Sequence, residues 1–205
     1  MNVADKYNKI YSENKVVFGV GKPEGIVEKI LDFGKTGTAL ELGAGEGRNS
    51  LFLASHGFTV RAVDISEIGV SKIRTIAQKQ NLPLEVEVAD ITAFIWDKNY
   101  DVIVSTFVFH HLPRAIVLNL VHQMQAHTAD GGFNAVTLFK DGGDFSRHSF
   151  GQDFFYVKDD ELQALYGDWE ILKYFERERP AFDKNSDGTS MVNTCAYLLA
   201  RKRNS

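Results

Sequence analysis

Three glycines alternate directly after an apolar run, at Gly43, Gly45 and Gly47, and an acidic side chain, Glu41, stands two residues before the first of them. Glycine lets the chain turn sharply and lets a ligand touch the main chain without a Cβ between them. A helix that starts just after such a loop presents free N–H groups to the same crevice. A turn without a ligand needs one such glycine, so three in alternation favour a binding loop.

The spacing of these residues restricts the ligand. The dinucleotide fingerprint G-x-G-x-x-G requires a third glycine, but Arg48 or Ser50 stands at that position, depending on whether the count starts at Gly43 or Gly45. The loop also lacks the G-K-[ST] ending of a nucleotide-binding P-loop. A carboxylate such as Glu41 is unfavourable beside a diphosphate and favourable beside an ammonium or sulfonium group. We therefore expect a ligand that carries such a positive group.

Short apolar runs alternate with longer amphipathic segments along most of the chain. This alternation predicts a parallel sheet with helices on both faces. Two helices, at 3–13 and 23–33, are expected before the first strand, with Pro23 in the first turn of the second helix. The expected strands that follow are residues 38–42, 59–63, 84–88, 100–106 and 133–139, and the expected helices between them are residues 47–56, 67–80 and 114–127.

The alternation of expected strands and helices changes after residue 139. A short helix is expected near 158–166, followed by two strands, 169–177 and 194–202, joined by the polar stretch 178–190. Such a closing pair is naturally antiparallel. The predicted fold class is therefore α/β: a Rossmann-like, doubly wound, seven-stranded mixed sheet, mostly parallel with an antiparallel C-terminal strand, with helices on both faces. In such a sheet ligands bind outside the carboxyl ends of the strands, where the glycine loop lies.

The composition indicates one globular domain. The chain has 205 residues, of which 44% are hydrophobic and 24% charged, a length and a core content that suit a single unit. We divide this domain, 1–205, into an N-terminal helical lid (1–34), a cofactor-binding core (35–139) and an acceptor-side segment (140–205) that ends in the closing strand pair.

The charge and the cysteine content restrict the classes of partner and of metal site that the chain can have. The formal net charge of −4 argues against a nucleic-acid partner, because phosphate binding needs a basic face. The one cysteine, Cys195, allows no internal disulfide and no cysteine-based zinc site, and we assign no metal ligand. The polar N-terminus and the short apolar runs predict no signal peptide and no membrane span, hence a cytoplasmic protein. No obligate protein partner is evident.

The stretch LELGAGEG, residues 40–47, resembles motif I of class I S-adenosylmethionine-dependent methyltransferases. Asp64 follows Gly43 by 21 residues, a distance that suits a carboxylate on the ribose; alone, an Asp in that position could equally cap a helix. The stretch VADI, residues 88–91, resembles the acidic turn at the adenine, and YDVIVSTFVFHHL, residues 100–112, resembles the motif IV strand, whose end faces the methyl group.

The resemblance implies a cofactor, S-adenosyl-L-methionine, and the residues that would contact it. The motif I residues would surround its methionine end, and the residues after the second and third strands would contact its ribose and adenine. The implied cofactor-binding residues in these three regions and on the motif IV strand are Glu41, Gly43, Ala44, Gly45, Asp64, Ile65, Asp90, Ile91 and Ser105.

Over nearly its full length the chain is similar to a narrower group, the tellurite-resistance-type methyltransferases. The shared stretches include residues 47–64 and 161–174, and the resemblance puts Arg48 and Asn49 near the amino acid end of the cofactor. Those relatives carry a His-Arg pair associated with catalysis where this chain has Phe182 and Asp183. Tellurite or selenium-oxyanion methylation is therefore only one candidate chemistry.

Two histidines and several aromatic residues complete the predicted site. His110 and His111 follow the motif IV strand and are candidate general bases, because imidazole titrates near neutrality. Alternatively, one of them packs or caps before Pro113. Tyr11 and Phe18, together with Tyr7, resemble the N-terminal lid over the cofactor, and an aromatic ring can attract a sulfonium group.

The sequence thus predicts methyl transfer from S-adenosyl-L-methionine to a small-molecule acceptor, such as a tellurium or selenium oxyanion, a thiol or another small metabolite. The chain shows neither a separate substrate domain nor the Asn/Asp-Pro-Pro-aromatic signature of nucleic-acid amino-methyltransferases. A nicotinamide-dependent oxidoreductase, a non-catalytic S-adenosylmethionine-binding protein and an aminopropyl transferase are the alternatives.

Overall fold

The protein is built around a mixed, seven-stranded sheet. The computed structural model describes residues 2–15, 17, 22–148 and 154–204. The strands follow the order β3-β2-β1-β4-β5-β7-β6, in which β1 to β5 are parallel and β7 is antiparallel to both of its neighbours. Their bounds are β1 Gly37–Leu42, β2 Phe58–Asp64, β3 Leu84–Val88, β4 Tyr100–Thr106, β5 Thr128–Phe139, β6 Glu170–Lys184 and β7 Ser190–Arg201.

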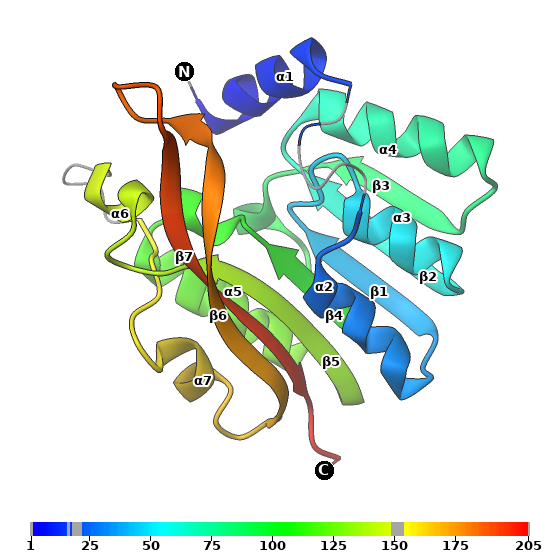
Figure 1. Cartoon of the computed structure of the whole chain (residues 1–205). Helices are drawn as coiled ribbons and strands as arrows, with labels where there is room; N and C mark the ends of the chain where they lie inside the picture. Colours follow the sequence, from blue (N-terminus) through cyan, green and yellow to red (C-terminus); the bar gives the residue numbers. More distant parts are fainter. Residues whose placement is uncertain (1, 16, 18–21, 149–153, 205) are drawn as a thin grey trace.

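Helices cover both faces of this sheet (Figure 1). The α-helices are α1 Val3–Glu13, α2 Gly25–Glu28, α3 Arg48–Ser55, α4 Glu67–Lys79, α5 Arg114–Ala126, α6 Asp144–His148 and α7 Glu161–Leu165; the 3₁₀ helices are η2 Lys29–Phe33, η3 Ile91–Ala93 and η4 Phe109–His111. In the described ranges, no helix is both long enough and apolar enough to cross a bilayer. The α/β fold class predicted from the sequence is confirmed.

The core lies in two layers because side chains of a strand alternate between the faces of the sheet. In β1, Leu40 packs with the cluster that includes Val117 and Leu120 of α5, whereas Ala39 packs with the cluster that includes Ile26 of α2 and Leu53 of α3. Both faces of β1 are therefore buried, as expected for a central parallel strand. This packing fixes the direction in which the glycine loop leaves the sheet.

Some predicted boundaries are wrong. The helix expected over 23–33 is α-helical only over Gly25–Glu28 and continues as the 3₁₀ helix η2. Glu24 is the residue before the first helical turn, so Pro23 lies outside it. Gly34 ends η2 with φ of +63°, a conformation that favours glycine.

The polar stretch 178–190, expected to be a loop, is largely strand. Strand β6 extends to Lys184 and pairs with β7 as far as Ser190. An antiparallel hairpin satisfies its own backbone hydrogen bonds, so polar side chains do not prevent pairing when they face solvent. Strand β5 likewise begins at Thr128, five residues before the expected start. The longer hairpin brings Arg179 and Asp183 to the carboxyl end of the parallel strands.

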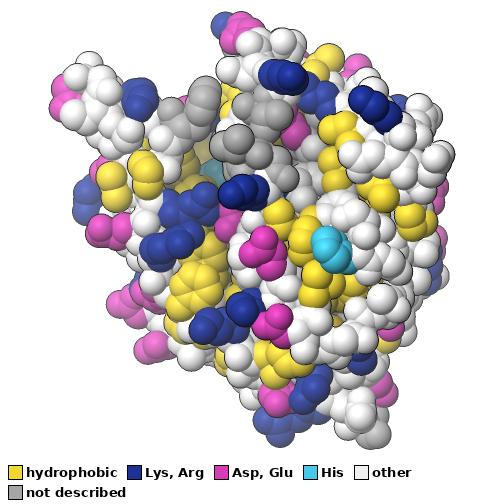
Figure 2. Space-filling view, turned by 45° about the vertical axis from the view of Figure 1, so that its right-hand side comes forward, with side chains coloured by type: hydrophobic (Ala, Val, Ile, Leu, Met, Phe, Trp, Pro, Cys, Tyr) yellow, Lys and Arg dark blue, Asp and Glu magenta, His cyan; other side chains and the backbone are white. Residues whose placement is uncertain are grey.

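The surface carries both signs of charge. Figure 2 shows Lys and Arg side chains interspersed with Asp and Glu side chains on the face in view, with hydrophobic side chains between them. Figure 1 shows α1 lying across one end of the sheet, between α4 and the turn of the β6–β7 hairpin. That end is the one at which β1, β2 and β4 finish, so α1 lies over the predicted site.

Candidate active site

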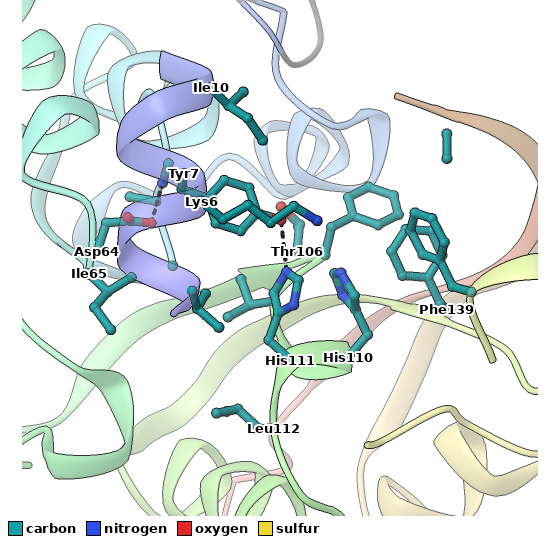
Figure 3. A pocket seen from close by; sticks show the side chains of 18 of the residues that line it. Lys6, Tyr7, Ile10, Asp64, Ile65, Thr106, His110, His111, Leu112 and Phe139 are labelled. Atoms are coloured by element: carbon teal, nitrogen blue, oxygen red, sulfur yellow. Dashed lines mark hydrogen bonds between the residues drawn. The ribbon is translucent and has the colours of Figure 1, made fainter. Parts of the chain in front are cut away.

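A cavity of about 840 Å³ opens at the carboxyl ends of the parallel strands. Figure 3 shows Asp64 and Ile65 on one side of it and Phe139 on the other, with Lys6 and Tyr7 reaching down from α1 between them. Its volume is in the range of small-molecule sites. We call the part near Asp64 the cofactor end and the part near Phe139 the acceptor end.

The glycine loop forms one wall of the cofactor end. Gly43, Gly45 and Gly47 have φ of +71°, +57° and +81°, a region that side chains with a Cβ disfavour. A Cβ on Gly43 would lie 2.2 Å from Val108 Cγ2, and a Cβ on Gly45 would lie 2.8 Å from the Tyr11 hydroxyl oxygen. The glycines are therefore needed both for the turn and for the close approach of neighbouring groups.

Asp64 ties the end of β2 to this loop. Its Oδ2 accepts a hydrogen bond from Gly45 N at 2.7 Å, and its Oδ1 accepts one from Ser66 N at 2.8 Å. Ser66, and not Asp64, caps α4, since its Oγ accepts from Gly69 N at 3.1 Å. A carboxylate offers about four acceptor positions, so Asp64 keeps positions for a ligand's hydroxyl groups.

The other predicted ribose and adenine residues also line the cavity: Ile65, Asp90 and Ile91. Asp90 precedes η3 and accepts from Thr92 N at 2.8 Å, which is a capping bond. One carboxylate oxygen of Asp90 thus supports the turn on which Ile91 stands. This arrangement holds the start of η3 against the cavity.

Glu41 is buried beside the same loop. Its carboxylate accepts from Asn49 Nδ2 at 2.7 Å and from the hydroxyl of Ser50. Burial raises the pKa of Glu41 to about 7, against the lowering effect of the hydrogen bonds from Ser50 and Asn49. A cation that entered the cavity would stabilise the charged form of this group.

Arg48 lines the cavity and joins a buried ion network. Arg48 and Arg179 approach the same oxygen of Glu24, at 2.6 and 2.7 Å. Both guanidinium groups also lie over the ring of Phe107, at 5.7 and 5.1 Å from its centroid. Phe107 has φ of +59°, which is rare for a bulky residue. Network and ring together hold β6 against the start of α3.

Two predicted cofactor residues lie elsewhere, and a third cannot be placed. Asn49 is buried and does not line the cavity; its side chain donates to Glu41 and Thr106 and accepts from Glu24 N. Ser105 also lies behind the wall, and the next residue, Thr106, lines the cavity instead. The third, Phe18, lies outside the described residues. The remaining predicted cofactor residues, Tyr11, Glu41, Gly43, Ala44, Gly45, Arg48, Asp64, Ile65, Asp90 and Ile91, all line the cavity.

The two histidines stand on η4, between the two ends of the cavity (Figure 3). His111 Nε2 forms a hydrogen bond with the Tyr7 hydroxyl at 2.8 Å, whereas His110 Nδ1 is buried and has no hydrogen-bond partner within the described ranges. Burial and the charge of Lys6 lower the pKa of His111 to about 4. Burial, His111 and Lys6 lower the pKa of His110 well below its usual value.

Aromatic side chains surround His110 at the acceptor end. Its ring packs edge-on against Phe139, with centroids 4.6 Å apart, and lies nearly parallel to Phe145 at 5.8 Å. Phe154 and Tyr156 line the same region. Asp183, one of the two residues that replace the relatives' His-Arg pair, lines the cavity and lies 3.7 Å from Lys6 Nζ; the side chain of Phe182 is outside what the structure describes.

Helix α1 is tied to the body by polar contacts. Asn8 Oδ1 accepts from Ser66 Oγ at 2.6 Å and from Ile68 N at 3.2 Å, at the start of α4. Tyr11 is buried on the face of α1 that covers Gly45. The helix therefore closes the cofactor end from above.

Sequence reasoning missed the contributions of Asn8, Glu24, Phe107 and Arg179. Arg179 meets Glu24 across 155 residues of chain, and no local pattern marks such a pair. The spacing of Tyr7 and Tyr11 did carry a signal, because residues four apart share one face of a helix. Their rings lie 5.7 Å apart in the structure.

Known proteins resemble this chain in sequence and in fold. A family model described as "Tellurite resistance protein TehB" matches residues 5–194. Hemagglutinin 1 of Eikenella corrodens is 37% identical over 163 residues, which cover 80% of this chain and 54% of that protein. A protein of Haemophilus influenzae named "Probable S-adenosyl-L-methionine-dependent methyltransferase TehB" is 34% identical over 170 residues, which cover 80% of this chain and 57% of that protein.

The chain thus spans about half the length of the curated relatives it matches. The crystal structure of TehB from Haemophilus influenzae matches it with a TM-score of 0.79 and 30% identity, over 98% of this chain and 67% of that chain. These similarities confirm the resemblance drawn from the glycine loop and the strands around it. Since the family model covers most of the sequence, the chain belongs to the tellurite resistance protein TehB family.

Proposed function

We propose that this protein is an S-adenosyl-L-methionine-dependent methyltransferase that acts on a small-molecule acceptor. One observation carries the proposal: a glycine loop with bare backbone is flanked by two buried carboxylates, Glu41 and Asp64, at the carboxyl edge of a doubly wound sheet. Membership of the family supports it, as does the name of the Haemophilus influenzae relative, a probable S-adenosyl-L-methionine-dependent methyltransferase.

The residues present fit this cofactor. Gly43 and Gly45 line the cavity, so the main chain of the loop can itself contact a ligand. Glu41 suits the positive groups of the methionine end, and Arg48 suits its carboxylate. Asp64 suits the ribose hydroxyl groups because its carboxylate has acceptor positions left after its two backbone bonds. Asp90 and Ile91 would contact the adenine.

S-adenosyl-L-methionine supplies a methyl group on a positively charged sulfur. The chain's own contribution is to align the acceptor with that group and to exclude water, which can lower the barrier by about 7–11 kcal/mol. Tyr7 and Tyr11 on α1 cover the cavity and serve the second purpose. An oxygen or nitrogen acceptor also needs a base, worth about 10²- to 10⁴-fold in rate. His110 and His111 lie where such a base is needed.

The test is thermal unfolding with excess S-adenosylhomocysteine, S-adenosylmethionine or NADH in parallel. A ligand at about 100 times its dissociation constant stabilises the folded state by about 2.7 kcal/mol, which raises the melting temperature by several degrees in a chain of this length, at about 2–4 °C per kcal/mol. We expect a shift with the two adenosyl compounds and none with NADH.

A melting shift with NADH and none with the two adenosyl compounds would instead indicate a nicotinamide-dependent oxidoreductase. Binding of the adenosyl compounds with no methyl transfer to a broad acceptor panel would favour a non-catalytic binding protein. The Asp64→Ala variant is the matched control, since its shift with S-adenosylhomocysteine should shrink if the ligand occupies the cofactor end.

A further inference from the structure

We infer that the methyl acceptor is a planar aromatic compound with an acidic hydroxyl group, and that His110 receives the proton of that group. The inference rests on the proposed function and names the substrate class for the acceptor end of the same cavity. It follows from three features of that end: the hydrogen bonding of the histidine pair, the rings around His110, and the pairing of the charges nearby.

The first feature is the unequal bonding of the two histidines. His111 Nε2 is held by the Tyr7 hydroxyl at 2.8 Å, but Nδ1 of His110 is buried and finds no hydrogen-bond partner in the part of the chain that the structure describes. An unpaired buried polar atom is costly and uncommon in folded proteins. Because no described residue holds a proton on Nδ1 or takes one from it, the tautomer of His110 is free to follow a ligand.

The second feature is the aromatic wall. The rings of His110, Phe139 and Phe145 contact one another, with centroids between 4.6 and 5.8 Å apart. Phe154 and Tyr156 line the same end of the cavity. Figure 3 shows Phe139 beside His110 and Leu112 below the pair of histidines. Such walls favour a flat aromatic ligand through offset and edge-on ring contacts.

The third feature is that the cationic side chains that line the cavity are paired with carboxylates. Lys6 lies 3.7 Å from Asp183, and Arg48 and Arg179 both contact Glu24. Tight binding of an oxyanion needs donors that point at it in a charge-assisted fork, whereas these donors already face acids and Asp183 adds a negative charge to the wall. The arrangement therefore favours an acceptor that enters uncharged.

The acceptor's hydroxyl must also be acidic. Burial, His111 and Lys6 lower the pKa of His110, so the imidazole is neutral at physiological pH but is a weak base. Such a base can take a proton from a phenol-like group, whose pKa is about 10 as in tyrosine, far more easily than from an aliphatic alcohol.

The step balances within the cavity. The O–H bond of the acceptor breaks, and its proton moves to a ring nitrogen of His110. The oxygen lone pair forms the new O–CH₃ bond, while the C–S bond breaks and its electron pair stays on sulfur, which becomes neutral. The proton then leaves the His110 imidazolium to water when the products depart.

The test uses 4-nitrophenol, whose phenolate differs in colour from its phenol. The probe is titrated into the full chain, with and without saturating S-adenosylhomocysteine, at a pH below the probe's own pKa in water. Because His110 is a weak base, we expect the probe to bind as the neutral phenol. With S-adenosylmethionine in place of S-adenosylhomocysteine it should be methylated, which removes the phenolate colour that appears when a sample is made alkaline. In the His110→Phe variant, which keeps a ring beside Phe139, the probe should still bind but be methylated at least about tenfold more slowly.

Two further variants provide a control and a test of the aromatic wall. His122→Phe changes an exposed histidine on α5 and should behave as the unmodified protein. Phe139→Leu keeps an apolar wall but removes a ring, so it should weaken 4-nitrophenol binding about 2- to 10-fold and leave cyclohexanol binding unchanged. If His110→Phe does not fold, the rate at which the unmodified protein methylates 4-nitrophenol relative to cyclohexanol and the Phe139→Leu comparison still decide.

The inference is overturned if the unmodified protein methylates cyclohexanol as fast as 4-nitrophenol, or if His110→Phe methylates 4-nitrophenol at the unchanged rate. It is also overturned if cyclohexanol or selenite displaces the probe as well as 1-naphthol does. A melting shift with S-adenosylhomocysteine but no probe binding refutes the acceptor class alone. No melting shift refutes the proposed function, while the titration without S-adenosylhomocysteine still tests the acceptor end.

Discussion

The two ends of the cavity are built in different ways. At the cofactor end the acids are already bonded: Asp64 binds two backbone N–H groups, and Glu41 binds Asn49 and Ser50. At the acceptor end the wall is made of rings, and His110 Nδ1 is buried with no hydrogen-bond partner among the described residues. The acids of the first end are thus held in place by the protein itself, whereas the second end leaves the proton position on His110 unfixed.

This difference follows from how the chain supplies each end. The glycine loop and its acids come from the last residues of β1 and β2 and from short segments directly after β1 and β3, so the parallel sheet aligns them. The acceptor end combines α1, η4, the end of β5, α6 and the β6–β7 hairpin. Parts from so many segments can vary without disturbing the sheet, and acceptor chemistry can therefore change within one fold.

The largest effect is expected for Gly43→Ala, which disrupts the glycine loop at the cofactor end. The new Cβ would lie 2.2 Å from Val108 Cγ2 at φ of +71°, so strain and overpacking should together lower the free energy of unfolding by about 2–5 kcal/mol. Gly142→Ala is the control, because its φ is +85° but nothing lies within 4 Å of the added Cβ; it should cost about 1–2 kcal/mol. Urea unfolding measures both. Equal losses would mean that the contact with Val108 contributes nothing.

Glu41 should make stability depend on pH. Its pKa is about 7 in the folded protein against 4.5 ordinarily, so the folded state holds the proton more tightly than the unfolded state. The free energy of unfolding should therefore fall as the pH rises from about 4.5 to about 7, by about 3 kcal/mol, and stay level above that.

The variant Glu41→Gln should lose this fall in stability, which denaturation at about pH 5 and about pH 8 would detect. In the unmodified protein, binding of the cationic cofactor should release protons near neutral pH, because it favours the charged carboxylate. Calorimetry in buffers of different ionisation enthalpy measures that release. A slope that persists in Glu41→Gln would assign the pH dependence to another group.

Asp64→Ala should weaken binding at the cofactor end and leave the acceptor end intact. We expect S-adenosylhomocysteine to lose about 1–3 kcal/mol of binding free energy, since hydrogen bonds to a buried charged group are removed. Isothermal titration calorimetry gives the value. Asp97→Ala, an exposed acid paired with Arg61, should bind normally. Unchanged affinity in a folded Asp64→Ala protein would remove Asp64 from the binding site.

The smallest effect is expected for Asn8→Ala, which loosens the helix that covers both ends. It removes two hydrogen bonds to the start of α4, worth about 1 kcal/mol each. Hydrogen exchange in α1 should speed up while the sheet keeps its protection. Lys9→Ala, the next residue on the exposed side of α1, should not change exchange. Uniform loss of protection throughout the chain would show that α1 is part of the core.

The cofactor end was largely predictable from the sequence. Gly43, Asp64 and Asp90 stand at fixed distances after strands whose apolar pattern is easy to read, and each lines the cavity. Asn49 and Ser105 show the limit of such matching. Asn49 follows Arg48 and Ser105 precedes Thr106, and both of those neighbours line the cavity. One residue further along a helix or strand, the side chain points to the core instead.

The acceptor end was only partly predictable. His110 and His111 could be named, but nothing local indicated that His111 would bond Tyr7 while Nδ1 of His110 finds no partner among the residues described. The stretch 178–190 was expected to be a loop because it is polar, although it pairs with β7 and carries Arg179 into the cavity.

The sequence by itself determined the doubly wound sheet, the glycine loop and the acids around it, because backbone sterics and strand order act over short distances along the chain. Only the tertiary structure decided how Arg48 and Arg179 share Glu24, how Phe139 and Phe145 enclose His110, and how α1 covers the cavity. Those contacts join residues far apart in the chain, and their geometry depends on the packing of all the elements together.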